Sequence, residues 1–211
     1  MSANPAIRAW RAYLSGARRR SQLREWRSRG YGLPAPYCVK IEILMRRGDP
    51  EATWIETGTY LGETTDALAR RARHVFTIEP ATELAERARV RFLGRTNVTV
   101  LEGTSEAMLE PALEGINGDV SFWLDGHYSS GPTFQGDADT PIVEELHIIE
   151  RHLARLGRVV ILVDDIRCFR SGDAGMPSYP ERSSLVAWAD RLGFSWEIEQ
   201  DIFIATRATG G

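Results

Sequence analysis

Acidic residues follow several short apolar segments of the chain, and they are the first candidates for chemistry. Glu56 and Glu79 end two such segments, Asp125 ends a third, and Asp164 and Asp165 end a fourth. Parallel strands bring their carboxyl ends to one edge of a sheet, and open α/β sheets bind ligands outside that edge. The sequence therefore predicts a ligand site in which these carboxylates converge.

A turn with two glycines follows Glu56. Gly58 and Gly62 lie between an expected strand and an expected helix, where the lack of a side chain lets the backbone approach a ligand closely. The hydroxyls of Thr64 and Thr65 follow at the helix N-terminus, which favours a bound carboxylate or phosphate. The spacing differs from the dinucleotide-binding pattern G-x-G-x-x-G.

Two further strand ends carry polar residues with possible binding or capping roles. Glu79, roughly 20 residues beyond the glycine turn, is placed to accept hydrogen bonds from ribose hydroxyls. Thr104 and Ser105 follow another strand end, and Ser105 is expected to cap the next helix.

Asp125, Asp164 and Asp165 are expected in one cleft, because the strands that they end should be neighbours in the sheet. Three carboxylates this close repel one another unless they are protonated or bridged by a cation. Oxygen ligands suit a hard ion such as Mg²⁺. The sequence therefore predicts a divalent metal site, with turn-capping aspartates as the alternative.

His127 lies in a glycine-rich turn just after Asp125 and is the candidate general base for a substrate hydroxyl, since histidine titrates near neutral pH. Its alternative role is a hydrogen bond within the loop. His74, His147 and His152 fall inside expected strands and helices, and we interpret them as structural.

The apolar segments alternate with helical patterns, which predicts a parallel sheet buried on both faces. Right-handed crossovers then give a doubly wound, Rossmann-like α/β sheet of seven strands, with an antiparallel hairpin at the C-terminus. The expected strands are residues 53–57, 74–79, 98–103, 120–125, 159–164, 195–200 and 201–207. The expected helices are residues 5–29, 39–47, 63–73, 82–93, 105–113, 140–156 and 182–192.

The N-terminal region is basic, although the whole chain has a net charge of −3. Its expected helix carries arginines together with Trp10, Tyr13 and Trp26 on one face. An exposed aromatic stripe among arginines is typical of interfaces, so we expect a lid over the strand ends or a homodimer contact. The alternatives are a solvated helix and a contact with nucleic acid or another anionic surface.

The composition is that of a soluble globular protein. The 211 residues are 43% hydrophobic and 26% charged, unlike a disordered chain. No apolar run approaches the ~18 residues of a membrane span, and the first residues lack the apolar core of a signal peptide. Cys38 and Cys168 are too few for a disulfide framework and suit the cytoplasm. We expect one α/β domain over residues 37–211, preceded by a helical arm over residues 1–36.

The sequence from Glu56 to Thr65, with Glu79, Ser105 and Asp125, resembles the cofactor site of the class I S-adenosylmethionine-dependent methyltransferases. The stretch FWLDGHYSSGP, residues 122–132, resembles a bacterial group of methyltransferases with a D-G-H-Y-S-G-G motif. The pattern G-x-Y-x-G-x-T over residues 58–64 is similar to the turn of metal-dependent, catechol-type O-methyltransferases. The resemblance covers residues 40–207.

This resemblance implies roles for the matching residues around the first turn. Glu56 and the turn from Gly58 through Tyr60 to Gly62 would hold the methionine part of S-adenosylmethionine. Thr64 would lie beside the carboxylate of that methionine part.

The resemblance also implies roles for the later strand ends. Glu79 would accept hydrogen bonds from the ribose, and Ser105 would lie near the adenine amino group. Asp125, Asp164 and Asp165 match the acids that hold Mg²⁺ in the catechol type.

The sequence departs from the catechol-type pattern at several positions. Asp165 stands where that type has asparagine, and Thr104 stands where many methyltransferases have an acid that pairs with adenine. Tyr128 stands where the catechol type has its catalytic lysine, so His127 is the candidate base in its place.

Together these residues predict an S-adenosylmethionine-dependent methyltransferase that methylates a small-molecule or sugar hydroxyl, with Mg²⁺ as a candidate second cofactor. The alternatives are a nucleotide- or dinucleotide-binding enzyme on a similar sheet and a non-catalytic scaffold that uses the basic arm. The expected partner is a small acceptor. We expect no membrane contact and rank nucleic acid last.

Overall fold

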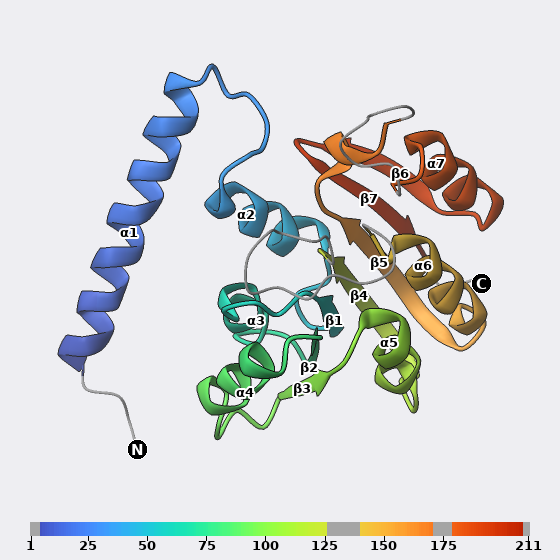
Figure 1. Ribbon diagram of the computed structural model, residues 1–211, viewed down its shortest axis with the longest axis horizontal. Helices are drawn as coiled ribbons and strands as arrows, with labels where there is room; N and C mark the ends of the chain where they lie inside the picture. Colours follow the sequence, from blue (N-terminus) through green and yellow to red (C-terminus); the bar gives the residue numbers. More distant parts are fainter. Residues whose placement is uncertain (1–4, 126–139, 171–178, 209–211) are drawn as a thin grey trace.

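The computed structural model describes residues 5–125, 140–170 and 179–208, with side chains from Gly16 onward. Seven strands are present among these residues: β1 Thr53–Thr57, β2 His74–Glu79, β3 Val98–Glu102, β4 Gly118–Leu124, β5 Leu156–Val163, β6 Ser195–Glu199 and β7 Ile202–Arg207. They form one sheet in the order β3-β2-β1-β4-β5-β7-β6 (Figure 1). β1 to β5 are parallel, and β7 runs antiparallel to both β5 and β6. The predicted fold class is confirmed.

The helices of the described residues are α1 Pro5–Ser28, α2 Tyr37–Arg47, α3 Glu63–Leu68, α4 Thr82–Arg91, α5 Ser105–Leu113, α6 Ile142–His152 and α7 Arg182–Arg191. A short 3₁₀ turn covers Ile166–Cys168. Two predicted helix ends were wrong. α3 stops at Leu68, and α6 stops at His152 because Leu156 already pairs with Gly118 as part of β5.

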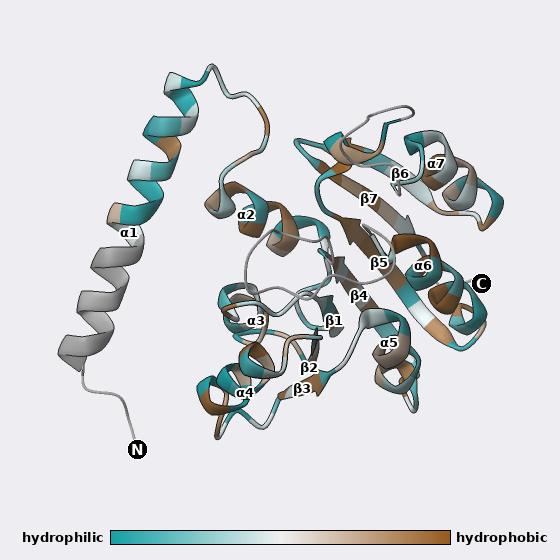
Figure 2. Cartoon of the chain, in the orientation of Figure 1, coloured by the Kyte–Doolittle hydropathy of each residue, from teal (hydrophilic) through white to brown (hydrophobic). Residues whose placement is uncertain are grey.

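The sheet is buried on both faces, as its continuous apolar strands require. Along β5, Val159 and Ile161 pack into the core beneath α5, α6 and α7. Val160 and Leu162 alternate with them and pack on the opposite face with residues of α2 and α3. Figure 2 shows the same contrast, because the central strands are hydrophobic whereas the described part of α1 is mostly hydrophilic.

The ends of β1, β4 and β5 lie level with one another, which determines where the site forms. Leu124 is the partner of Thr57 on one side and of Val163 on the other. Backbone hydrogen bonds continue one residue further, from the N–H of Asp125 to the carbonyl of Thr57 and from the N–H of Asp164 to the carbonyl of Leu124. The register therefore places Asp125 directly beside Asp164.

Helix α1 stands beside the domain and reaches it through its C-terminal part and α2 (Figure 1). Trp26 is buried rather than exposed, which corrects the predicted stripe. Its indole N–H donates to the carbonyl of Gly32, and its ring meets Tyr31 edge-on. The side chains of Trp10 and Tyr13 lie outside the described residues. Among the described helices, none combines the length and apolar character needed to span a membrane.

Candidate functional site

The glycine turn after β1 is held by the carboxylate that ends β2. The backbone N–H of Tyr60 donates to Oε2 of Glu79 over 2.7 Å, and the N–H of Ala81 donates to Oε1 over 3.0 Å. Gly58, Tyr60 and Gly62 all have positive φ, at 88°, 47° and 72°. Glu79 is buried, so the two predicted cofactor elements form one unit at the sheet edge.

Gly62 has a packing role. A Cβ at this position would come within 2.9 Å of the Phe92 ring. The second glycine of the turn is therefore needed for close contact with the residue after α4, in addition to its positive φ.

Glu56 is fully buried at the end of β1, and only one of its two carboxylate oxygens accepts hydrogen bonds from the described residues. Its Oε2 accepts hydrogen bonds from the hydroxyls of Thr65, over 2.5 Å, and Thr77, over 2.7 Å. Its Oε1 accepts none from the described residues. Burial raises the pKa of Glu56 to about 7, and the two hydroxyls oppose that rise. The Thr65 hydroxyl thus lies in the core, bonded to Glu56, rather than at the open face of the turn.

Glu145 is a second buried carboxylate, and no sequence motif pointed to it. It lies on α6, and its Oε1 also has no hydrogen-bond partner among the described residues. Burial raises its pKa to about 7, opposed by the hydroxyls of Ser105 and Thr57. The available signal was an acid on the apolar stripe of α6, between Ile142 and Ile149.

Ser105 is the first residue of α5, and the residue before it, Thr104, occupies the cap position. Neither hydroxyl caps the helix, so the predicted capping role of Ser105 was wrong. Ser105 is buried instead, and it lies near the carboxyl of Glu145.

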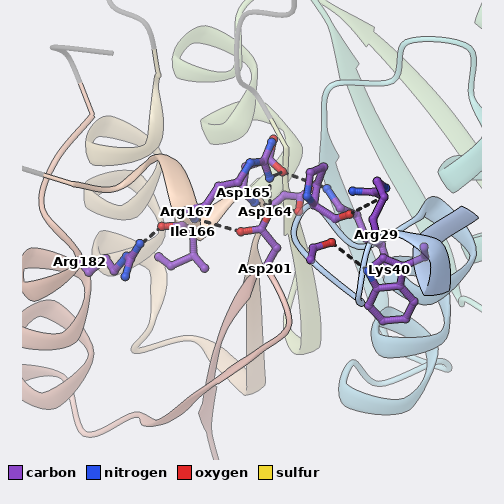
Figure 3. Close-up of polar contacts among 11 residues, drawn as sticks. Arg29, Lys40, Asp164, Asp165, Ile166, Arg167, Arg182 and Asp201 are labelled. Carbon is purple, nitrogen blue, oxygen red and sulfur yellow. Dashed lines mark hydrogen bonds and ion pairs between the residues drawn. The ribbon is translucent and has the colours of Figure 1, made fainter. Parts of the chain in front are cut away.

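The three strand-end aspartates do converge. Asp125, Asp164 and Asp165 each offer a carboxylate oxygen within 4.8 Å of the others. The ammonium group of Lys40 lies among them, with Nζ 2.5 Å from Oδ2 of Asp164 and 3.0 Å from Oδ1 of Asp165 (Figure 3). Burial opposes the charge of Lys40, but the carboxylates outweigh it and its pKa is raised. We call Asp125, Asp164 and Asp165 the acidic cluster.

Arg167 is a second cation at the acidic cluster, and it lines the same cavity as Lys40. Arg167 pairs with Asp165 over 2.5 Å and with the fully buried Asp201 (Figure 3). The backbone N–H of Arg167 also donates to Asp201, over 3.0 Å. Asp165 itself has a φ of 55°, which is a strained backbone conformation for a residue with a side chain and is typical of functional sites.

The acidic cluster fits a divalent ion by spacing but not by the state of its oxygen atoms. Its ligand atoms are close enough to surround one ion. Both oxygens of Asp164 and Oδ1 of Asp165, however, accept hydrogen bonds from N–H groups, two of them from Lys40. The Lys40 ammonium thus occupies the position predicted for Mg²⁺.

A cavity of about 310 Å³ opens beside the acidic cluster. Its polar lining includes Lys40, Thr64 and Asp125, and its apolar lining comes from α2, the segment before it and Trp123 of β4. Tyr37 also lines the cavity, and burial raises its pKa to about 12, opposed by a hydrogen bond with Thr64. The cavity therefore joins the start of α3 to the ends of β4 and β5.

The other predicted catalytic residue, His127, lies outside the described residues, as does Tyr128. Lys40 is the sole lysine among the 26 basic residues of the sequence, and no motif includes it. That rarity was the available signal for its role, but helix periodicity carries no information about a partner so distant in the chain.

One curated relative shares a segment of sequence with this chain. Protein-L-isoaspartate O-methyltransferase of Ignicoccus hospitalis is 40% identical over 91 residues. The match covers 39% of this chain, and the chain spans only 42% of the length of that relative. No family model matches the chain.

Solved structures match over most of the chain at low identity. An rRNA methylase from Streptococcus thermophilus aligns with a TM-score of 0.50 at 17% identity, over 84% of this chain and 98% of its own. The DhpI–SAH complex aligns with a TM-score of 0.51 at 15% identity, over 91% of this chain and 97% of its own. A Streptococcus mutans protein in complex with SAH aligns with a TM-score of 0.51 at 18% identity, over 82% of this chain and 97% of its own. The chain therefore has the Rossmann-like fold of class I methyltransferases.

Proposed function

We propose that this protein is an S-adenosylmethionine-dependent methyltransferase that methylates a hydroxyl of a small polar molecule such as a sugar. The observation that carries the proposal is a pair of buried carboxylate oxygens, Oε1 of Glu56 and Oε1 of Glu145, that accept no hydrogen bond from the described residues. Buried polar atoms are normally satisfied, so these two favour a ligand with N–H donors or positive charge. S-adenosylmethionine carries an ammonium group and a sulfonium.

The surrounding residues suit the rest of this cofactor. In the turn from Gly58 to Gly62, residues with positive φ leave the backbone open to close contact with a ligand. Glu79 ends the next strand, and Ser105 begins α5. We assign the turn, Glu79 and Ser105 to the methionine part, the ribose and the adenine respectively. S-adenosylmethionine supplies an activated methyl group when bound, so the protein mainly has to align an acceptor and remove a proton.

The cavity beside the acidic cluster suits a small acceptor. Thr64 and Asp125 both line it, so a molecule bound there would lie next to the methionine part of the cofactor. Its volume of about 310 Å³ is at the small end of ligand pockets. The lining combines charged and apolar groups, which suits a polyhydroxyl compound that has both hydroxyl groups and C–H surface.

Methyl transfer removes a proton from the acceptor hydroxyl. The oxygen bonds to the methyl carbon while the carbon–sulfur bond breaks and sulfur keeps the electron pair. We assign the proton to the carboxylate of Asp125, which lines the cavity, with His127 as the second candidate. Mg²⁺ has no part in this assignment, because the Lys40 ammonium lies against Asp164 and Asp165.

Calorimetric titration with S-adenosylhomocysteine tests the cofactor, and a panel of polyhydroxyl acceptors with labelled S-adenosylmethionine tests the reaction. We expect saturable one-site binding and label transfer to at least one acceptor. Asp125→Asn should retain S-adenosylhomocysteine binding and lose transfer. A folded protein that binds NAD(P) and not S-adenosylhomocysteine would refute the proposal in favour of a nucleotide enzyme.

A second candidate acceptor is RNA, favoured by the exposed arginines of α1. Arg18 and Arg19 pair with Glu63 and Glu42, whereas Arg20, Arg24 and Arg27 also lie exposed on the same helix. A salt-sensitive gel shift with structured RNA that is lost when these three are changed to serine would favour this acceptor. Label transfer to polyhydroxyl compounds alone would exclude it.

A further inference from the structure

The side chain of Lys40 is unusual because a lysine from α2 ends inside a cluster of acids from β4 and β5. Only 16% of this side chain is exposed, and Asp164 and Asp165 are 3% and 4% exposed. Lys40 is separated from Asp164 by 124 residues in the sequence. A charged side chain is seldom held in this way unless it compensates buried charge of the opposite sign.

The carboxylate oxygens of Asp164 and Asp165 accept hydrogen bonds from N–H donors of the protein. Oδ2 of Asp164 and Oδ1 of Asp165 accept from Lys40, and Oδ1 of Asp164 accepts from the backbone N–H of Asp165 over 2.8 Å. Oδ1 of Asp165 also accepts from Arg167. A metal ion bound to these oxygens would have to displace the Lys40 ammonium, whose nitrogen already lies at hydrogen-bond distance from two of them.

We propose that Lys40 is a built-in cation that takes the place of a divalent metal ion in the acidic cluster and keeps the reaction cavity metal-free. The ammonium balances part of the negative charge that three close carboxylates create. Unlike a metal ion, it is attached to the chain and is not removed by a chelator. The acids that resemble a metal site are thereby used to bind a side chain.

Lys40 also faces the acceptor. An ammonium has three N–H donors, and among the described residues two of them reach Asp164 and Asp165. Since Lys40 lines the cavity, the third donor serves to orient an acceptor oxygen next to Asp125. This orienting role rests on the proposed function, whereas the metal-free state of the acidic cluster does not.

The test is a titration with Mn²⁺ alone, followed by calorimetry and by the electron paramagnetic resonance signal of free Mn²⁺. The wild-type protein should bind no Mn²⁺ at the acidic cluster. Lys40→Ala removes the ammonium and makes room, so this variant should gain a saturable Mn²⁺ site that is roughly tenfold or more tighter than any residual binding by the wild type. Adding Asp164→Asn to Lys40→Ala should abolish that gain.

Arg46→Ala is the matched control, because Arg46 is an exposed cation on the same helix that pairs with Glu199. Its Mn²⁺ affinity should equal that of the wild type. If Lys40→Ala fails to fold, Lys40→Met retains most of the side-chain volume and is titrated instead. The wild-type titration needs no variant at all.

Two results would overturn the proposal. One is stoichiometric Mn²⁺ binding by the wild type that Asp164→Asn removes. The other is a folded Lys40→Ala protein with no gain in Mn²⁺ affinity. The proposed function is judged separately, because S-adenosylhomocysteine binding to the wild type is measured in EDTA, where no metal ion is available to the acidic cluster.

Discussion

The carboxylate of Glu79 accepts the backbone N–H of Tyr60 over 2.7 Å, so the last residue of β2 holds the glycine turn that follows β1. The second oxygen of the same carboxylate holds the N–H of Ala81 at the approach to α4. One side chain therefore joins the two loops between which we place the ribose.

We expect Glu79→Gln to weaken S-adenosylhomocysteine binding by about tenfold or more, which is about 1.4 kcal/mol. The amide turns one N–H donor toward a backbone N–H, which disturbs the turn as well as the proposed ribose contact. Calorimetric titration measures the loss. Glu102→Gln is the control, because Glu102 ends the adjacent β3 and binds Thr82 and Arg89 instead. Equal losses in the two variants would contradict the role of Glu79.

Arg167→Met should lower the free energy of unfolding by about 3–5 kcal/mol, because it leaves the fully buried Asp201 without its guanidinium partner. Urea unfolding followed by circular dichroism measures the change. Arg191→Met removes an exposed partner of Glu150 and should change the free energy of unfolding by less than about 1 kcal/mol. A similarly small effect at Arg167 would mean that water reaches Asp201.

Binding of S-adenosylhomocysteine should strengthen as the pH rises from 6 to 8. The pKa values of Glu56 and Glu145 are raised to about 7, and an ammonium group nearby favours their ionised forms. Binding at pH 7 should therefore release protons. Calorimetry in two buffers with different ionisation enthalpies measures this release. An affinity that does not change with pH, together with no proton release, would contradict the contact of Glu56 and Glu145 with the ammonium group.

Glu145→Gln should change how stability depends on pH. The pKa of Glu145 lies near 7 in the folded protein and near 4.5 when unfolded, so the unfolded chain releases this proton first as the pH rises. The associated stability is fully present below pH 4.5 and is lost as the pH rises through 7, by about 3 kcal/mol in all.

The glutamine variant lacks this loss, so its stability relative to the wild type should increase between pH 5 and pH 8. Urea unfolding at both pH values measures the difference. Glu144→Gln, at an exposed position on the same helix, should keep the wild-type pH dependence. A constant difference between Glu145→Gln and the wild type would show that the carboxyl of Glu145 is solvated.

The sheet and its strand ends could be predicted because buried parallel strands are apolar along their whole length and end at polar residues. Val159 to Val163 illustrates this, since alternate residues enter the two cores. The acids at the ends of β1, β2, β4 and β5 followed directly from that pattern. Their convergence could be predicted from strand order alone.

The partners of these acids could not be predicted in the same way. Lys40 and Glu145 lie on helices, and which group a helical side chain meets depends on how the helix packs on the sheet. Trp26 illustrates the same difficulty, because the helical pattern gives its face but not its contact with the turn at Gly32. The three aspartates of the metal prediction do converge, but the sequence could not reveal the competing cation, Lys40, because it comes from another element.

The contact between Lys40 and Asp164 also sets an order of assembly. During synthesis α2 leaves the ribosome first, and its lysine has no acidic cluster to meet until β5 has emerged and paired with β4. The loop that this contact closes is among the long ones that slow folding. The reaction cavity is consequently complete only after β5 has joined the sheet, because Asp164, Asp165 and Arg167, which follow β5, line it.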